Sequence, residues 1–315
     1  MSDARHSVLN GGCTPRTVTR RCPAKLNLSL AVLDRRADGF HAIESLIVPI
    51  DLADTLTVQT GGEPGIRLVI RCEGPRAAAL ASDVPVDETN LVVRAAAAVA
   101  HEAGIEPALD IDLVKVIPSQ AGLGGGSSDA AAMLLAATEI WNLDWPLERL
   151  GMIAARLGSD VPWFLKSVPA VVGGRGEVIT PVIALPSPPL FAVVVCPPTG
   201  LSTASVYKAC KPDRRRTGEA LLLADALARD DIVAVKPLMH NALESAARTL
   251  SPDIDRLLGD IAEAGGPTPR LTGSGSACFT LCRTKAQAET VALRLRELVD
   301  DGAPRWPAVF TVQLG

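Results

Sequence analysis

The stretch 119–129, SQAGLGGGSSD, places four glycines within five positions, directly before two serines and an aspartate. The segment before it, 109–118, alternates like a strand, and the alanine-rich segment 127–143 after it is typical of a helix. The N-terminus of a helix has unpaired N–H groups and a partial positive charge, and glycine lets the backbone approach an anion closely. We therefore predict a phosphate-binding loop, with a serine-capped turn as the simpler alternative.

The loop does not follow either common nucleotide-binding pattern. A Walker A loop needs a lysine before its hydroxyl residue, and GxGxxG needs a glycine where Ser127 stands. A cation must therefore come from elsewhere, and Lys25 is the candidate. It lies in the alternating segment 24–33, on one face with Asn27 and Ser29, although plain solvent exposure would also explain that face. Asp129, in the first helical turn, suits the helix dipole and is a possible neighbour of magnesium.

Composition indicates a globular protein that is neither basic nor membrane-spanning. The chain has 315 residues, about two domains, and its core is aliphatic because 48% of residues are hydrophobic and only 3% aromatic. The net charge of −4 argues against a nucleic-acid partner, and we expect the RRR run 214–216 to be a solvated loop. Seven scattered cysteines and four histidines predict reduced, cytoplasmic thiols and no metal-ligand cluster. No apolar run reaches membrane-spanning length, and residues 1–20 lack a secretory core.

Strand-like and helix-like segments are mixed throughout the chain. We expect strands at 24–33, 43–58, 66–72, 109–118, 190–196, 270–282 and 307–313, and helices at 90–104, 127–143, 147–158, 217–229, 231–249, 253–264 and 285–299. Residues 166–190 are rich in glycine and proline, and Gly173, Gly174 and Gly176 are typical of a hairpin turn. We therefore predict an N-terminal extension at 1–20 and domains at 21–175 and 176–315.

Three segments together resemble the signature motifs of the GHMP kinase superfamily. They are PAKLNLSLAVLDRRADGFH (23–41), PSQAGLGGGSSDAAAML (118–134) and LTGSGSACF (271–279). The first segment, with GSDVPWF (158–164) and GRGE (174–177), most resembles the family that phosphorylates a cytidine diphosphate-linked methylerythritol. The resemblance implies an α+β, two-domain GHMP kinase fold. Its N-terminal α/β domain would be ribosomal-S5-like, its C-terminal domain ferredoxin-like, and its active site would lie in the cleft between them.

The resemblance also implies roles for individual residues. Lys25 and Asp160 would be the catalytic pair, although Asp160 alone reads as a helix N-cap. ATP would be bound by Pro118, Gly122, Leu123, Gly124, Gly125, Gly126, Ser127 and Ser128, and would carry Mg²⁺ with it, without a metal site made by the protein alone. The acceptor would be bound by Asn27, Phe40, His41, Thr203, Tyr207, Gly273, Ser274 and Gly275. The family often has tyrosine at the position of Phe40, and Tyr207 matches its motif loosely.

Two other functions are open at this point. Another kinase of the superfamily, acting on mevalonate, homoserine or a sugar, would share the glycine loop, but DRRADGFH argues against it. A catalytically silent ligand sensor would have lost the acid or the lysine, and both are present as Asp160 and Lys25. The expected partner is a small-molecule substrate, for a monomer or homodimer.

Overall fold

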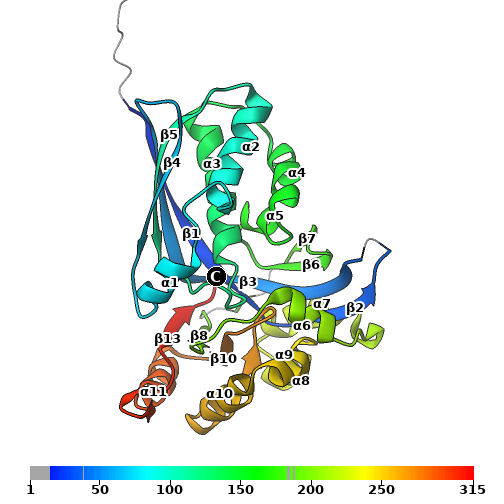
Figure 1. The fold of residues 1–315 in the computed structure, drawn as a ribbon. Helices are drawn as coiled ribbons and strands as arrows, with labels where there is room; N and C mark the ends of the chain where they lie inside the picture. The colour runs from blue at the N-terminus through cyan, green and yellow to red at the C-terminus, as the bar shows by residue number, and fades with distance from the viewer. Residues whose placement is uncertain (1–14, 38, 183–184, 187–188) are drawn as a thin grey trace, which may run out of the picture.

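The computed structural model describes residues 15–37, 39–182, 185–186 and 189–315, and it consists of two units, each built on a β-sheet (Figure 1). Most of the predicted N-terminal extension, together with Cys13 and Asp38, lies outside these residues. None of the helices in the described ranges is both long and apolar enough to span a membrane.

The first sheet is organised around one long central strand, β3. Its strands are β1 (Thr17–Asn27), β2 (Ala31–Arg35), β3 (His41–Thr60), β4 (Gly65–Cys72), β5 (Ala108–Lys115), β6 (Ala170–Gly174) and β7 (Val178–Pro181). The order is β4–β5–β3–β6–β7, and β1 and β2 also pair with β3. The first half of β3 pairs with β2 and β6, and its second half pairs with β1 and β5. β3 therefore carries the sheet from one end of this unit to the other.

The helices α2 (Leu91–Ala103), α3 (Gly125–Ile140), α4 (Leu147–Leu157) and α5 (Val161–Phe164) lie together on one side of this sheet in Figure 1. The short helix α1 (Ala77–Asp83) lies apart from them and contacts β4. The central helix, α3, is buried on nearly every side, and half of its residues are alanine, leucine or methionine. A helix that is apolar all round belongs inside a core, and α3 contacts the sheet and the helices α2, α4 and α5. Its N-terminus is thereby held at a fixed place.

The second unit has the ferredoxin-like order that the sequence resemblance implied. Its sheet is β13–β8–β10–β9, with every pair antiparallel. The strands are β8 (Phe191–Cys196), β9 (Arg270–Leu271), β10 (Cys278–Cys282) and β13 (Ala308–Gln313), and β11 (Val299–Asp300) and β12 (Ala303–Pro304) form a separate hairpin. The helical segments are α6 (Thr203–Ala209), η1 (Arg214–Arg216), α7 (Glu219–Ala228), α8 (Ile232–Leu238), α9 (Glu244–Leu250), α10 (Pro252–Glu263) and α11 (Lys285–Arg296).

Several element boundaries differ from the sequence prediction. β1 already begins at Thr17, and β6 and β7 form the predicted glycine hairpin within the first sheet, so that sheet continues to Pro181. The segment expected as one strand at 24–33 is interrupted after Asn27. The expected helix 231–249 is divided into α8 and α9, and the expected strand 270–282 is divided into β9 and β10. At these interruptions the chain makes long-range hydrogen bonds, such as the one from the Leu30 N–H to the His240 carbonyl at 2.8 Å.

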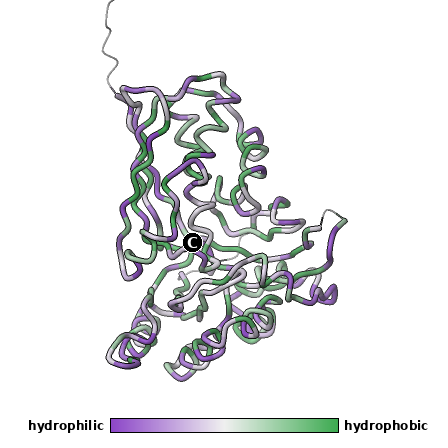
Figure 2. The backbone as a smooth tube through the Cα atoms, in the orientation of Figure 1, coloured by the Kyte–Doolittle hydropathy of each residue, from purple (hydrophilic) through white to green (hydrophobic). Residues whose placement is uncertain are grey.

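The two units share one hydrophobic core. Leu26 and Leu46 of the first sheet belong to the same buried cluster as Ala192 and Val194 of β8. In Figure 2 hydrophobic segments of both units meet along this junction. At the end of the chain, the Gly315 N–H donates to the Pro49 carbonyl at 3.0 Å. The two units therefore pack directly against each other through a shared hydrophobic cluster.

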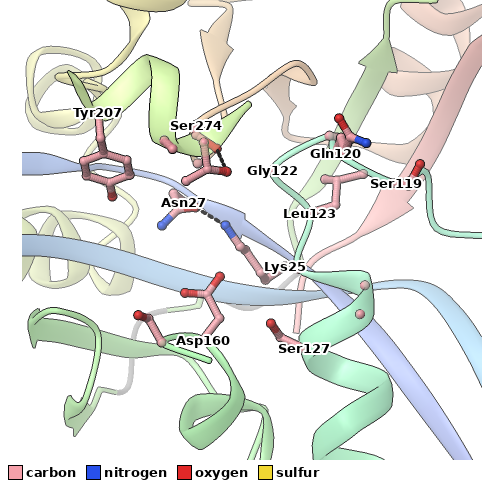
Figure 3. A pocket seen from close by; sticks show the side chains of 18 of the residues that line it. Lys25, Asn27, Ser119, Gln120, Gly122, Leu123, Ser127, Asp160, Tyr207 and Ser274 are labelled. Atoms are coloured by element: carbon pink, nitrogen blue, oxygen red, sulfur yellow. Dashed lines mark hydrogen bonds between the residues drawn. The ribbon is translucent and has the colours of Figure 1, made fainter. Parts of the chain in front are cut away.

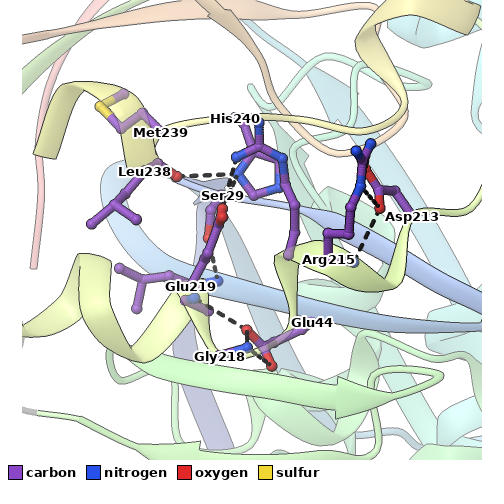
Figure 4. Close-up of polar contacts among 12 residues, drawn as sticks. Ser29, Glu44, Asp213, Arg215, Gly218, Glu219, Leu238, Met239 and His240 are labelled. Carbon is purple, nitrogen blue, oxygen red and sulfur yellow. Dashed lines mark hydrogen bonds and ion pairs between the residues drawn. The ribbon is translucent and has the colours of Figure 1, made fainter.

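Glu44 of β3 ties the first sheet to α7 (Figure 4). Its carboxylate accepts hydrogen bonds from the N–H groups of Gly218 at 2.9 Å and Ala220 at 3.1 Å. A carboxylate at a helix N-terminus satisfies unpaired donors and complements the dipole. The nearby RRR run forms η1, where Arg214, Arg215 and Arg216 pair with Asp34, Asp213 and Glu219. The run is exposed and each of its charges is paired, as expected of a solvated segment.

Replacing Leu46 by alanine tests the shared core. Leu46 is fully buried where the units meet, so Leu46→Ala should lower the free energy of unfolding by about 2–5 kcal/mol. Both units should still unfold in one transition. Urea unfolding is followed by circular dichroism and, in a Trp306→Phe background, by the fluorescence of the three tryptophans of the first unit. Met152→Ala, at an exposed position, is the control, and two separate transitions would contradict the shared core.

Candidate active site

A pocket of about 1280 Å³ lies where the two units meet (Figure 3). It is lined by the end of β1, the turn between β2 and β3, the glycine loop, the start of α3, the residues before α5, the helix α6 and the loop after β9. These segments are far apart in sequence and come from both sheets. The predicted site residues that line the pocket are Lys25, Asn27, Phe40, His41, Pro118, Gly122, Leu123, Gly124, Gly125, Gly126, Ser127, Asp160, Thr203, Tyr207, Gly273 and Ser274.

Two predicted site residues do not line this pocket. Ser128 is 2% exposed, and its N–H donates to the Gly124 carbonyl within the first turn of α3. A Cβ on Gly275 would face the side chains of Leu271 and Leu201. Neither residue is on the pocket wall, because successive residues of a helix or a tight turn point in different directions. The structure therefore does not bring Ser128 and Gly275 to the pocket wall with the other predicted residues.

The glycine loop is held by backbone hydrogen bonds on two sides. On one side, the Leu123 carbonyl accepts from the Lys25 N–H of β1 at 3.0 Å. On the other, the Ala121 carbonyl accepts from the Ala277 N–H at 3.1 Å, in the third motif. Gly124, at φ 75°, precedes the first residue of α3 and makes no side-chain cap. The N-terminal N–H groups of α3 therefore start at the pocket wall.

Gly122 makes the contact between the glycine loop and the third motif possible. Its φ is +76°, and an added Cβ would lie 2.3 Å from the Thr272 carbonyl oxygen and 3.1 Å from the Gly275 nitrogen. Only glycine fits there without displacing backbone. The third motif therefore approaches the glycine loop closely. In the structure that motif connects two antiparallel strands, β9 and β10.

Asn241 holds the third motif from the other side, and sequence reasoning did not find it. Its side-chain amide donates to the carbonyls of Leu271 at 2.9 Å and Gly273 at 2.8 Å. The Thr203 and Ser274 hydroxyls are 2.8 Å apart and join α6 to the same loop. Asn241 lies in the segment between α8 and α9 that the sequence assigned to one continuous helix. Nothing in the local pattern marks it, because its partners are thirty residues away.

Lys25 is buried in the floor of the pocket. The sequence had left open the alternative that its side chain is simply exposed to solvent. The side chain is 4% exposed and its Nζ donates to the Asn27 Oδ1 atom. The Asn27 Nδ2 atom in turn donates to the Ser45 hydroxyl at 2.7 Å. Burial lowers the pKa of Lys25, and the negative charge of Asp160 partly opposes that shift. The polar face formed by Lys25, Asn27 and Ser29 is therefore internal and organised by hydrogen bonds.

Asp160 lies across the pocket from Lys25, with its carboxylate directed toward the ammonium group (Figure 3). It occupies the N-cap position of α5, as the simpler reading of the sequence predicted, but its side chain makes no capping hydrogen bond. Among the described residues, Lys25 and Asp160 also make no direct ion pair. The carboxylate oxygens are therefore available to a group that enters the pocket between the two charges.

Aromatic rings line the end of the pocket near β2 and α6. The His41 and Tyr207 rings have centroids 5.6 Å apart and an interplanar angle of 31°. Phe40 is 52% exposed, which is unusual for a large apolar side chain. Burial, together with the nearby charge of Asp160, raises the pKa of Tyr207, so its hydroxyl is neutral. This end is suited to a flat, aromatic part of a ligand.

Behind the glycine loop lies a buried ion-pair cluster that the sequence did not indicate. The Lys115 ammonium contacts Asp54 and also Asp129, at 2.7 Å. Asp54 accepts the N–H groups of Val116 and Ile117 as well. Asp129, which the sequence suggested as a possible neighbour of magnesium, lines the pocket and contacts Lys115. The cluster connects β3, β5 and the first turn of α3.

Within this cluster, the pKa of Asp129 is moved close to neutrality. Burial, together with the charge of Asp54, outweighs the attraction of Lys115 and raises the pKa of Asp129 to about 7. One of its oxygens, Oδ1, is buried without a hydrogen-bond partner. Burial lowers the pKa of Lys115, but the two carboxylates outweigh it, so the net direction is upward. The lysine is therefore charged while Asp129 gains a proton near neutrality.

Comparison with known proteins gives matches to one superfamily over both units. The family description "GHMP kinases N terminal domain" matches residues 90–168, and "GHMP kinases C terminal" matches residues 223–301. The chain is 37% identical over 280 residues to the 4-diphosphocytidyl-2-C-methyl-D-erythritol kinase of Pelotomaculum thermopropionicum, covering 89% of this chain and 94% of that protein. It is also 37% identical over 284 residues to the enzyme of the same name from Mycobacterium tuberculosis, covering 89% and 86%.

Solved structures agree with these matches. A crystal structure of 4-(cytidine 5'-diphospho)-2C-methyl-D-erythritol kinase superposes with a TM-score of 0.73 at 35% identity, covering 95% of this chain and 99% of that one. A homoserine kinase from Cytophaga hutchinsonii gives a TM-score of 0.72 at 18% identity, covering 95% of each chain. The second likeness shows a shared fold only.

The raised pKa of Asp129 predicts a pH-dependent stability. The folded state holds a proton on Asp129 between about pH 4 and 7, where the unfolded state has lost it, so stability falls as pH rises through this window. Asp129→Asn removes that titration. Between pH 5 and 7.5 the free energy of unfolding of the wild type should fall by about 2 kcal/mol relative to Asp129→Asn, as measured by urea unfolding. The free energy of unfolding of Asp144→Asn, at an exposed position, should change with pH in the same way as that of the wild type. A difference between Asp129→Asn and the wild type that stays constant with pH would refute the raised pKa of Asp129.

Proposed function

Because the chain belongs to the 4-diphosphocytidyl-2-C-methyl-D-erythritol kinase family, within the GHMP kinases, we propose that it transfers the γ-phosphoryl group of ATP to the 2-hydroxyl of 4-diphosphocytidyl-2-C-methyl-D-erythritol. The family assignment makes it an ATP-dependent kinase of isoprenoid synthesis. The specific hydroxyl and the residue roles are the proposal. The observation that carries it is that the Asp160 carboxylate makes no capping hydrogen bond and faces the buried Lys25 beside the glycine loop.

In the proposed reaction, a bond forms between the acceptor oxygen and the γ-phosphorus while the bond from that phosphorus to the β–γ bridging oxygen breaks. ADP leaves with that oxygen, and the hydroxyl proton passes to Asp160. Phosphoryl transfer has a loose transition state, so positioning and electrostatics supply most of the catalysis. A carboxylate with an ordinary pKa of about 4 is a weak base, but in a loose transition state the proton can move late.

The glycine loop and the start of α3 support the proposal that ATP binds at this part of the pocket. Backbone N–H groups from Gly124 to Ser127 line the pocket, and the positive end of the α3 dipole lies behind them. Magnesium would be carried with the nucleotide and would neutralise charge on its phosphates. The Ser127 hydroxyl and the Asp160 carboxylate are oxygen donors on this part of the wall, which fits the ligands that Mg²⁺ prefers.

Lys25 has an electrostatic role in this proposal. Its ammonium faces Asp160 across the pocket and would attract the oxygen on which negative charge develops. Asn27 accepts a hydrogen bond from the Lys25 Nζ and is itself held by Ser45, so the ammonium is oriented before substrate enters. Buried charges interact more strongly than exposed ones, because water screens them less.

The aromatic end of the pocket supports a cytidine-linked acceptor over the acceptors of related kinases. Phe40, His41 and Tyr207 offer ring faces and ring N–H groups that suit a pyrimidine base. Mevalonate and homoserine have no ring that would use them. A silent ligand sensor is disfavoured because Lys25 and Asp160 are both present and face each other.

Asp160→Ala tests the role of the base. With magnesium-ATP and 4-diphosphocytidyl-2-C-methyl-D-erythritol, kcat should fall by about 10²–10⁴-fold, as expected for loss of a general base, while KM for ATP changes little. ADP release and product mass are followed together. Asp144→Ala, at an exposed position outside the pocket, should keep full activity.

The outcomes separate the reaction from the residue. If the wild type phosphorylates this acceptor but Asp160→Ala retains its rate, the reaction stands and the role of Asp160 is wrong. If the wild type phosphorylates mevalonate or homoserine instead, the acceptor is wrong. A protein that binds ATP but turns over none of these acceptors would support the sensor.

A further inference from the structure

Two side chains between α8 and α10, Asn241 and Glu244, hold the backbone of the third motif. The Asn241 amide donates to the carbonyls of Leu271 at 2.9 Å and Gly273 at 2.8 Å. The Glu244 carboxylate accepts from the Leu271 N–H at 3.0 Å. Because β9 is the edge strand of its sheet, these side chains take the place of a further strand beside it. The motif is thereby held on the side away from β10.

The orientation of the Asn241 amide is set by its partners. Its Oδ1 atom accepts from the Leu243 N–H at 2.9 Å, while its Nδ2 atom donates to the two carbonyls. The opposite orientation would place an oxygen against two carbonyl oxygens. The side chain is only 9% exposed, so water does not readily replace a lost donor. Asn241 is therefore a buried residue whose hydrogen bonds bear directly on the third motif.

The backbone around Asn241 is also bound to the first unit. The Leu30 N–H donates to the His240 carbonyl at 2.8 Å, and the Ala242 N–H donates to the Leu30 carbonyl at 2.8 Å. Leu30 follows the end of β1 by three residues, in the connection to β2. The main chain of Asn241 is therefore fixed to the first unit, and its side chain to a loop of the second.

The third motif in turn contacts the end of β1 that lines the pocket. The Thr272 hydroxyl accepts from the Asn27 N–H at 2.9 Å. Gly273, at φ +55°, lies so close to Lys25 that an added Cβ would be 3.0 Å from the lysine Nζ atom. That Nζ donates to the Asn27 side chain, as Figure 3 shows. The position of Lys25 and Asn27 therefore depends on where the third motif lies.

We propose that Asn241 is a positioning residue for Lys25 and Asn27 and acts through the third motif. The proposal rests on the function proposed above and deepens it. Donation from the Asn241 amide holds Gly273 and the neighbouring Thr272, the Thr272 hydroxyl fixes Asn27, and Asn27 orients the Lys25 ammonium. A misplacement of about 1 Å can lower the rate of an enzyme by about a hundredfold, even when its cause lies away from the reacting atoms.

The first test measures kinetics with magnesium-ATP and 4-diphosphocytidyl-2-C-methyl-D-erythritol. Asn241→Ala should lower kcat by about tenfold to a hundredfold and change KM for ATP less than twofold. Asn241→Asp keeps the size of the side chain but loses the amide donors, so its kcat should fall at least as far. A wild-type kcat in Asn241→Asp would mean that Asn241 only fills space and would overturn the proposal.

Thr280→Val is the matched control for a loss of stability alone. The Thr280 hydroxyl is fully buried on β10 and donates to the Pro267 carbonyl at 2.6 Å, away from the pocket. Its replacement removes a comparable hydrogen bond from the side chain to the backbone in the same unit. Thr280→Val should lower the midpoint of urea unfolding and leave kcat unchanged. If it lowers kcat as much as Asn241→Ala does, the effect of Asn241 is general destabilisation and the proposal is wrong.

Thr272→Val tests the same connection from its other end. It removes the acceptor of the Asn27 N–H and nearly keeps the shape of the side chain, so kcat should fall by a similar factor. In the double variant with Asn241→Ala, kcat should stay within about twofold of the lower single variant, because both changes act on one connection. Losses that multiply would show that Asn241 acts by another route and would overturn the proposal.

Amide hydrogen exchange follows the connection without any turnover. In Asn241→Ala the Asn27 N–H should exchange at least tenfold faster, as measured by mass spectrometry of overlapping peptides, while peptides of β5 keep their wild-type rates. Faster exchange in the third motif alone, with Asn27 still protected, would contradict the proposal. If Asn241→Ala does not fold, Thr272→Val decides by the same two measurements: a wild-type kcat would overturn the proposal.

These measurements distinguish failure of this inference from failure of the proposed function. If the wild type phosphorylates no cytidine-linked acceptor, the proposed function fails and the positioning role for that reaction fails with it, whatever the exchange rates are. If the wild type is active and both Asn241 variants keep its kcat, the proposed function stands and the role of Asn241 is wrong.

Discussion

The backbone contact between Gly122 and Thr272 is the constraint on which the pocket depends. It brings a loop of the first unit against a loop of the second at a distance that no side chain would permit. Hydrogen bonds from Ala277 to the glycine loop and from Asn241 to the third motif hold both partners in place. Since both loops line the pocket, part of its shape follows from a contact between main chains.

The charged groups around the glycine loop fall into two sets, and members of both line the pocket. Lys25 and Asp160 face each other without direct contact, which leaves both available to a ligand. Lys115 is paired with Asp54 and Asp129 and joins the first turn of α3 to the sheet. Burying charged groups is costly unless they are paired. The paired cluster can serve the fold, whereas the unpaired charges suit a site that a charged substrate completes.

The same packing holds the two units together. The leucines of β1 and β3 pack directly on β8, and the last residues of the chain hydrogen-bond to the middle of β3. The walls of the pocket come from both units and are joined by this packing. For the proposed phosphoryl transfer, in which positioning supplies much of the rate, such packing is useful.

The sequence alone predicted many of the local elements and, through a family resemblance, sixteen of the residues that line the pocket. Alternation and glycine spacing predicted the strand, loop and helix around 119–129, and the motifs that contain Lys25 and Asp160 could be recognised because each is contiguous. Tertiary structure alone decided that the Lys25 face is buried, that Ser128 turns away from the pocket, and that Asn241, Lys115 and Arg175 belong to its surroundings. The physical reason is that these properties depend on partners many residues away in the chain. A local pattern reports the period of an element, but it does not report which element from the other unit packs against it.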